Sequence, residues 1–255
     1  HADISVNADL RWSLPHLCEG LKFDGQALYE RYEDWRHSVL DMKAVHPFAT
    51  RHLEGTISPQ SLFEALQAVT DDDTVVVTDV GQHQMWSAQF FNLNKPRHFI
   101  TSGGLGTMGY GLPAAMGAKI GCPQSTVVLF TGDGSIMMNC QEFATLHKYG
   151  VDVKVVVLHN NVLGMVNQWQ RMFYSGHCSQ SVISDNPDLT ALSGAMGVPG
   201  LSVRNPEKLD DAVAWLFHTE GPALLDVFIP PDENVYPMVP GGKRLDQMVL
   251  GGVAE

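Results

Sequence analysis

Two polar residues follow two apolar runs of this sequence, where strands of a sheet would end. Asp133 follows the run 126–130 within Thr131-Gly132-Asp133-Gly134-Ser135, and Asn160 follows the run 153–158. Asn160 comes 27 positions after Asp133, which allows one helix and one strand, so we expect both side chains to project from neighbouring strand ends toward one point. A carboxylate and an amide oxygen, completed by a backbone carbonyl, phosphate oxygens and water, form a set suited to Mg²⁺.

The turn around Asp133 also suits an anion. Gly134 lets the backbone approach a ligand closely, and Ser135 with the amides after it offers a helix N-terminus. An Asp after a strand is more often a helix cap, so this turn by itself leaves capping and binding open.

The charge of the chain restricts its partners. It has 16 Lys+Arg against 28 Asp+Glu, a net charge of -12, which repels nucleic acid and anionic membranes. No apolar run approaches the roughly 20 residues that span a bilayer. The four cysteines are too few and too scattered for a disulfide framework, so we expect a cytoplasmic protein. An anionic ligand would have to be held by something other than a basic patch.

Apolar and β-branched runs alternate with helical periods from residue 58 onward. This alternation predicts an α/β fold, an open, mostly parallel sheet with helices on both faces. Ser58 and Pro59 predict the cap and first residue of a helix that ends at Val69. The predicted strands cover 74–78, 98–101, 126–130, 153–158, 201–203 and 223–229. The other predicted helices cover 24–42, 82–91, 106–120, 136–149, 165–174 and 207–218.

We expect three parts along the chain. Residues 1–45 read as a linker or the remnant of a preceding domain, and residues 46–229 as the main ligand-binding domain. Residues 230–255, rich in proline and glycine, read as a C-terminal tail or lid. Because the chain begins with His1, we expect a processed or truncated product.

Several motifs together resemble the large catalytic subunit of acetohydroxyacid synthase (acetolactate synthase). A Gly-Asp-Gly turn followed some 25 residues later by Asn is the signature of thiamin-diphosphate enzymes, and Gly132-Asp133-Gly134 with Asn160 fits it. The other matching stretches are 81–86, 102–115, 163–170 and 233–238. The resemblance covers nearly the whole chain but only the C-terminal part of that subunit, whose FAD-associated domain would precede residue 46.

The resemblance implies a role for each matching residue. Asp133, Asn160 and the backbone carbonyl of Val162 would ligate Mg²⁺. The residues that would bind thiamin diphosphate are Gln82, His83, Gly134 and Ser135 at the diphosphate, Gly106, Thr107 and Met108 at the aminopyrimidine, and Gly164 and Met165 along the cofactor-side wall. Met108 would support a bent cofactor. The family commonly has Asn where this chain has His159, which leaves the ligand Asn160 intact.

One aromatic residue is open to two interpretations. Met165, Trp169 and Phe173 recur at helical spacing, a stripe that is more often core than pocket. In the family, the Trp of the Gln-Trp-Gln motif lines the pocket of the second substrate and favours 2-ketobutyrate over pyruvate, and we expect this role for Trp169.

The implied reaction decarboxylates pyruvate and joins the hydroxyethyl unit to a second 2-keto acid, which forms 2-acetolactate or 2-aceto-2-hydroxybutyrate for branched-chain amino acid synthesis. The family's catalytic Glu lies in a domain that this chain lacks, so we expect no catalytic residue here and no turnover by this chain alone. The resemblance further implies FAD in the full-length subunit, a homodimer or tetramer with shared sites, and a small regulatory subunit.

Two alternatives stay open. One is another thiamin-diphosphate-dependent carboligase or 2-keto acid decarboxylase, against which Gln168-Trp169-Gln170 argues. The other is a non-catalytic phosphate-binding module, which would need no divalent metal.

Overall fold

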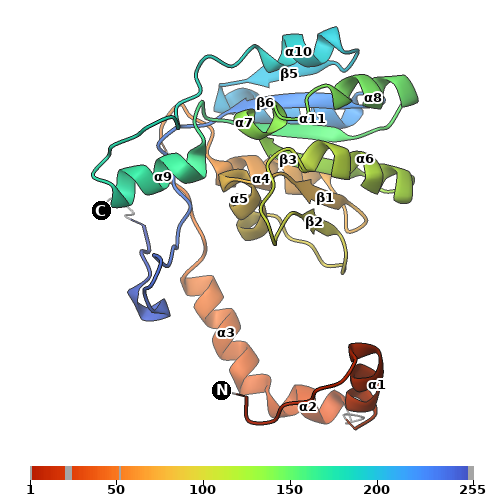
Figure 1. Cartoon of the computed structure of the whole chain (residues 1–255), viewed down its shortest axis with the longest axis vertical. Coiled ribbons are helices and arrows are strands. Elements are labelled where there is room, and N and C mark those ends of the chain that lie inside the picture. The colour runs from red at the N-terminus through yellow and green to blue at the C-terminus, as the bar shows by residue number, and fades with distance from the viewer. Residues whose placement is uncertain (1, 21–24, 52, 252–255) are drawn as a thin grey trace. The chain divides into compact units, whose positions relative to one another are not determined.

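A computed structural model describes residues 2–20, 25–51 and 53–251 of the chain (Figure 1). The chain divides into two compact units, residues 1–47 and residues 48–255. In the described part of the first unit lie α1 (Leu10–Gly20), α2 (Gly25–Arg31) and α3 (Glu33–Val45). The helix expected over 24–42 is therefore two helices. No helix was predicted over α1, which contains Pro15, a residue that usually interrupts a helix.

The second unit is built on a six-stranded sheet in which every neighbouring pair is parallel, in the order β2-β1-β3-β4-β6-β5. This confirms the predicted open α/β sheet, and each predicted strand lies within two residues of an observed one. The strands are β1 (Val75–Thr78), β2 (Phe99–Thr101), β3 (Val127–Gly132), β4 (Lys154–His159), β5 (Gly200–Val203) and β6 (Ala223–Phe228).

Helices cover both faces of the sheet. One apolar cluster joins it to α4 (Pro59–Val69), α5 (Gln82–Phe90) and α11 (Leu209–His218). A second cluster joins it to α6 (Gly111–Gly121), α8 (Glu142–Tyr149) and α10 (Leu189–Ala195). Successive strand residues alternate between the clusters: Val76 and Val128 belong to the first, and Val75 and Val127 to the second. The central strands are therefore buried on both sides, which explains their continuous apolar runs.

Two helix predictions need correction, and a third helix was missed. The helix expected from 106 begins only at Gly111, because Gly106 and Gly109 adopt positive φ angles in the loop before it. The helix expected over 136–149 begins only at Glu142, as α8, and a separate short helix, α7 (Asp133–Ile136), precedes it. The prediction also missed α10, which Asp188 caps by accepting bonds from two backbone amides.

The prediction at Ser58 is confirmed. Its side chain accepts from the Ser61 amide, the Ser61 side chain accepts from the Ser58 amide, and Pro59 is the first residue of α4. Helix α9 (Gly164–Phe173) follows β4. Two short 3₁₀ helices, η1 (Pro206–Lys208) and η2 (Leu245–Gln247), complete the described elements.

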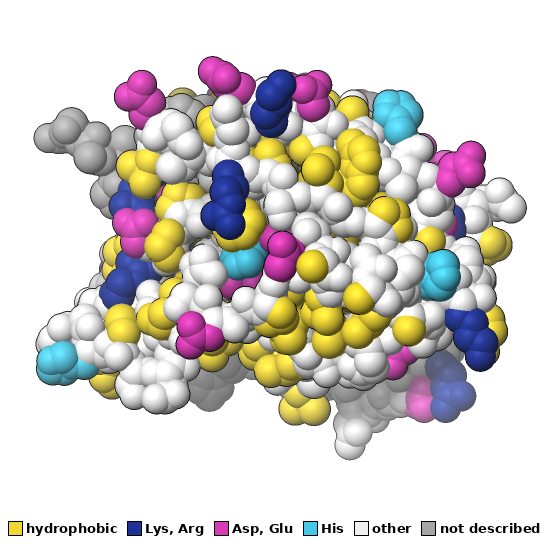
Figure 2. Space-filling view, turned by 90° about the horizontal axis from the view of Figure 1, so that it is seen from above, with side chains coloured by type: hydrophobic (Ala, Val, Ile, Leu, Met, Phe, Trp, Pro, Cys, Tyr) yellow, Lys and Arg dark blue, Asp and Glu magenta, His cyan; other side chains and the backbone are white. Residues whose placement is uncertain are grey.

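Charged side chains on the face drawn in Figure 2 are dispersed, with Lys and Arg interspersed among Asp and Glu. No broad basic patch appears on that face. Within the described residues, no helix combines the length and apolarity needed to cross a bilayer.

Candidate functional site

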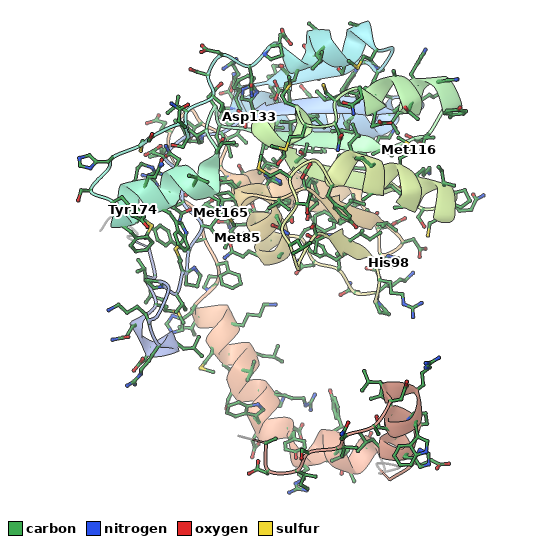
Figure 3. All side chains as sticks on the ribbon, in the orientation of Figure 1. Met85, His98, Met116, Asp133, Met165 and Tyr174 are labelled. Carbon is green, nitrogen blue, oxygen red and sulfur yellow. The ribbon has the colours of Figure 1, made fainter. Side chains whose placement is uncertain are left out.

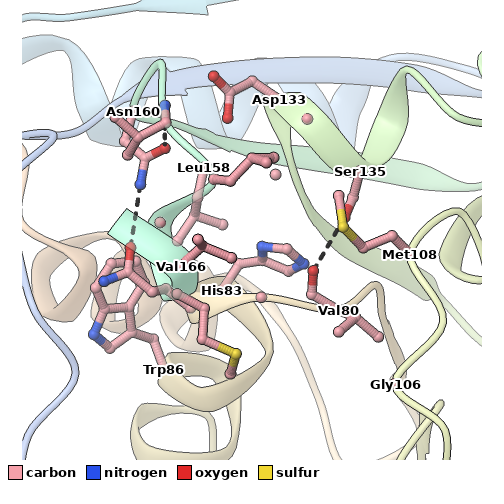
Figure 4. A pocket seen from close by; sticks show the side chains of 18 residues that line it. Val80, His83, Trp86, Gly106, Met108, Asp133, Ser135, Leu158, Asn160 and Val166 are labelled. Atoms are coloured by element: carbon pink, nitrogen blue, oxygen red, sulfur yellow. Dashed lines mark hydrogen bonds between the residues drawn. The ribbon is translucent and has the colours of Figure 1, made fainter. Parts of the chain in front are cut away.

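A cavity lies at the carboxyl ends of β1, β3 and β4, beside the first turns of α5 and α9 (Figure 4). Ligands of open α/β sheets bind at this edge. Every candidate residue from the sequence lines the cavity except Thr107 and Trp169. The lining candidates are Gln82, His83, Gly106, Met108, Asp133, Gly134, Ser135, Asn160, Val162, Gly164 and Met165. Sequence analysis missed other lining residues, among them Val80, Trp86, Leu158 and Leu163, although most adjoin the motifs.

Asp133 is the buried carboxylate of the cavity. It follows β3 at the first position of α7 and is 1% exposed. Figure 3 labels Asp133 and Met165, and both line the cavity. Asp133 Oδ2 accepts a 2.8 Å hydrogen bond from the backbone amide of Asn161. Burial raises the pKa of Asp133 to about 6, while the neighbouring His159 opposes this rise. The site therefore holds a carboxylate that a cation would stabilise.

Asn160 lies at the end of β4, the strand that pairs with β3. The expected meeting of two neighbouring strand ends is thus present in the sheet. Its Oδ1 accepts from the Val162 amide at 3.2 Å, and its Nδ2 donates to Gln82 Oε1 at 3.3 Å. Among the described residues, no group of three or more His, Cys, Asp and Glu side chains could hold a metal ion. A metal here would need amide and carbonyl oxygens beside the carboxylate.

His83 is a buried imidazole on the cavity wall. It lies in the first turn of α5, and Nε2 has no hydrogen-bond partner. Burial lowers the pKa of His83 to about 3, although a backbone hydrogen bond to Asp79 acts in the opposite direction. The ring packs against Gly132, where an added Cβ would lie 3.0 Å from Nδ1. His83 is therefore neutral at pH 7 and has a free nitrogen for a ligand.

Ser135 and Gly134 lie directly after Asp133. The Ser135 hydroxyl donates to the Val80 carbonyl at 3.1 Å, which ties the end of β1 to α7. A Cβ at Gly134 would lie 2.8 Å from Leu163 and 3.0 Å from Ile183. Met108 also lies beside Gly134. Position 134 therefore has no room for a side chain, because Leu163 and Ile183 already pack there.

The loop before α6 is held by a residue that the sequence analysis missed. Asp79, just after β1, accepts from the Gly109 amide at 2.9 Å, and Asn139 donates to the Gly109 carbonyl at 2.6 Å. The available signal was an Asp after a strand, the same pattern as Asp133. Thr107 is exposed, and its amide donates to Ser102 Oγ within the loop, so the structure places it away from the cavity.

His159, the departure from the family pattern, belongs to a buried polar group beside the metal-ligand candidates. Its Nδ1 lies 2.9 Å from Asp226 Oδ1, and its Nε2 lies 3.1 Å from Asn161 Oδ1 and 3.6 Å from Asp133 Oδ2. Burial lowers the pKa of His159, but the hydrogen bond and charge of Asp226, together with the Asp133 charge and the Asn161 hydrogen bond, raise it overall. His159 thus places an imidazole nitrogen beside Asp133.

A second, more open cavity lies along α9 and is lined in part by Trp169. Met165 and Val166 line both cavities. Trp169 is 44% exposed and packs edge-on against Phe173 at 5.8 Å. Trp169 and Phe173, which belong to the apolar stripe on α9, are therefore exposed and are not part of the core.

Comparison with known proteins agrees with this geometry. Residues 79–227 match the family model "Thiamine pyrophosphate enzyme, C-terminal TPP binding domain". The chain is 40% identical over 97% of its length to the acetolactate synthase large subunit of Lactococcus lactis, and 39% identical over 97% to the acetolactate synthase isozyme 2 large subunit of Escherichia coli. It is 41% identical over 96% to a mitochondrial acetolactate synthase catalytic subunit of Aspergillus candidus.

The chain spans less than half of each of these relatives, 42%, 44% and 35% of their respective lengths. The matched residues 79–227 contain β3 and β4, the residues directly after β1 that line the cavity, and both Asp133 and Asn160. The chain belongs to the family of the C-terminal TPP-binding domain of thiamine pyrophosphate enzymes.

Proposed function

We propose that this chain is the diphosphate-binding part of an acetolactate synthase catalytic subunit, with thiamin diphosphate (thiamine pyrophosphate) and Mg²⁺ as cofactors. The observation that carries the proposal is the placement of buried Asp133 and Asn160 at the ends of paired strands, over one cavity. The similarity to acetolactate synthase subunits over almost the whole chain supports the choice of reaction.

The donor atoms of the cavity fit Mg²⁺. Asp133 supplies a carboxylate, Asn160 an amide oxygen, and the backbone carbonyl of Val162 would be the third protein ligand. Burying the negative charge of Asp133 costs free energy, and the raised pKa of this carboxyl reflects that cost. A bound Mg²⁺ would offset it. The ion would also neutralise a diphosphate in a region with few basic side chains.

The cavity wall fits a diphosphate and an aromatic ring system. His83 Nε2 is buried without a partner, and Gly134 lines the cavity. Met108 and Gly106 line the cavity on the side of the loop before α6, where we place the aminopyrimidine. When bound, thiamin diphosphate supplies the electron sink for decarboxylating a 2-keto acid. The residues of the chain orient the cofactor, exclude water and hold its charge.

The substrates in this proposal are two 2-keto acids. Pyruvate is the donor of the hydroxyethyl unit, and pyruvate or 2-ketobutyrate is the acceptor. Trp169 lines the cavity next to the cofactor cavity, which suits a role in choosing the acceptor. The products, 2-acetolactate and 2-aceto-2-hydroxybutyrate, lead to branched-chain amino acids.

The remaining parts of such a subunit would lie outside this chain. They are the domain with the catalytic Glu, the FAD-associated domain and, in the partner subunit, the other half of each shared site. We further propose a homodimer or tetramer with a small regulatory subunit, in line with relatives that are named large or catalytic subunits.

A chimera tests the reaction. The Lactococcus lactis large subunit, with its matching C-terminal segment replaced by this chain, should convert pyruvate to 2-acetolactate when thiamin diphosphate and Mg²⁺ are present. The same chimera with Asp133→Ala is the matched control and should be inactive. A folded chimera that binds both cofactors and releases only the aldehyde would favour a 2-keto acid decarboxylase.

Calorimetry tests the binding site separately. Thiamin diphosphate is titrated into the wild-type chimera and the Asp133→Ala chimera, each with and without Mg²⁺. Binding should need both the metal and Asp133. Equal affinity in all four titrations would refute the metal site and favour a phosphate-binding module.

A further inference from the structure

Gln168 is a fully buried amide on α9, a helix that also carries exposed apolar side chains. It is 1% exposed, whereas Trp169 is 44% exposed and Val166 is 50% exposed. Gln168 Nε2 donates to the Val235 carbonyl at 3.1 Å, and Gln168 Oε1 accepts from the Val235 amide at 2.9 Å. A backbone amide can only donate and a backbone carbonyl can only accept, so Val235 determines which end of the Gln168 amide is oxygen.

The orientation of Gln168 then determines that of Gln82. Gln82 Nε2 donates to Gln168 Oε1 at 2.8 Å and to the Glu233 carbonyl at 2.9 Å. Both of its hydrogens therefore meet acceptors. A flipped Gln82 would place its oxygen against two other oxygens and leave buried donors unpaired, at a cost of about 1–3 kcal/mol per group.

Gln82 in turn orients Asn160. Gln82 Oε1 accepts from Asn160 Nδ2 at 3.3 Å, and on the other side Asn160 Oδ1 accepts from the Val162 amide. Asn160 is thus held with its nitrogen toward Gln82 and its oxygen away from Gln82. The position of the Gln82 side chain requires a glycine at residue 164, because a Cβ at Gly164 would overlap Gln82.

We propose that Gln168 is a positioning residue that transmits the orientation of the Val235 backbone, through Gln82, to the side-chain oxygen that Asn160 presents to a divalent metal ion. The part of the proposal that concerns the metal rests on the proposed function of Asn160. The consequence is that the backbone of tail residues 233–235 helps to orient the metal ligand Asn160, although these residues contribute no ligand themselves.

The docking of these tail residues is independently secured. Arg51 pairs with Asp232 at 2.9 Å and with Glu233 at 3.5 Å, and Arg171 donates to Asn234 Oδ1 at 2.7 Å. Gln89 donates to the Tyr236 carbonyl at 2.9 Å. Gln89 is therefore a matched control for Gln168: it also binds the tail through its amide, but it has no hydrogen bond to Gln82 or Asn160 among the described contacts.

The first test needs no metal. In the full 255-residue chain with labelled side-chain amides, NMR should show slow hydrogen exchange at Asn160 Nδ2 and Gln82 Nε2. Gln168→Met keeps the size of the side chain and removes the amide, so exchange at Asn160 should accelerate at least tenfold. Gln89→Met should leave it unchanged. Unchanged exchange in Gln168→Met would overturn the positioning role.

The second test measures Mn²⁺ binding by electron paramagnetic resonance, with thiamin diphosphate, in the chimera described above. Gln168→Met should weaken Mn²⁺ binding about tenfold, as loss of residues behind a metal ligand commonly does, and Gln89→Met should not. A similar loss in both variants would mean a general effect of tail undocking and overturn the specific role of Gln168. If the unsubstituted chimera binds no Mn²⁺, the proposed function fails, and the NMR result alone decides whether Gln168 orients Asn160.

Discussion

His159 and Asp226 form a buried pair at the carboxyl ends of two adjacent strands, with 2.9 Å between His159 Nδ1 and Asp226 Oδ1. The ring of His159 also stacks on Phe228 at 4.0 Å. The opposite nitrogen of the ring faces Asn161 and Asp133. The pair therefore supports the turn that carries the candidate metal ligands.

Breaking this pair should destabilise the chain. His159→Asn leaves the Asp226 carboxylate buried with a weaker partner, and we expect a loss of about 1–3 kcal/mol in the free energy of unfolding. A double-mutant cycle with Asp226→Asn, measured by urea unfolding, should give a coupling energy of at least about 1 kcal/mol.

The pH dependence of this coupling follows from the raised pKa of His159. The stabilisation is complete below about 6.5, the ordinary pKa of histidine, and is lost as pH rises through the higher pKa of the folded protein. The coupling should therefore be smaller at pH 9 than at pH 6. A coupling of zero at both values would contradict a functional pair.

Protonation of Asp133 should control metal binding. Because the pKa of this carboxyl is about 6 in the folded, metal-free protein, protons compete with the ion below that pH. The affinity of the chimera for Mn²⁺ should fall by up to tenfold for each pH unit below about 6. Calorimetric titrations between pH 5 and 8 would measure this slope.

The same group has the opposite effect on the metal-free chain. The folded state holds the proton more tightly than the unfolded state, whose ordinary value is about 3.9, so the contribution of Asp133 to stability decreases as pH rises from about 4 to about 6. Asp133→Asn should remove this part of the pH dependence. An unchanged profile would mean that Asp133 is not the titrating group.

Replacement of His83 should separate ligand binding from folding. His83→Leu removes the unpartnered nitrogen at similar volume, together with the hydrogen bond to the Asp79 backbone. The chain should therefore lose only about 1 kcal/mol of stability, while the affinity for thiamin diphosphate with Mg²⁺ falls about tenfold. The pKa of about 3 means that His83 should cause no change in affinity between pH 6 and 8. His98→Leu, at a histidine outside the cavity lining, is the control for calorimetry.

Trp169 should affect the choice of acceptor in the chimera. Trp169→Leu enlarges the second cavity, and the ratio of 2-aceto-2-hydroxybutyrate to 2-acetolactate from mixed substrates should fall about tenfold. Phe173→Leu removes the aromatic neighbour of Trp169 without changing the described cavity lining. Equal product ratios in both variants and the unsubstituted chimera would exclude this role.

Local sequence patterns determined the sheet and the position of the site. The continuous apolar runs at Val127–Phe130 and Lys154–Leu158 signal strands buried on both faces, and the interval between Asp133 and Asn160 is the length of one crossover. Because parallel neighbouring strands end at the same edge, these patterns were enough to bring a carboxylate and an amide together. The start of α6 and the position of α10 were missed, because a glycine-rich loop and a short capped helix have weak periodicity.

Only the tertiary structure decided the state of each group in the site. The pKa of Asp133 depends on burial by segments that are distant in the sequence. The hydrogen-bond partner of His159 is Asp226, which lies 67 positions later. Gln168 reads in sequence as one polar residue in a motif, yet it joins Gln82, 86 positions earlier, to Val235, 67 positions later. Hydrogen-bond direction between such distant groups is set by how the strands and tail pack, and no local pattern encodes it.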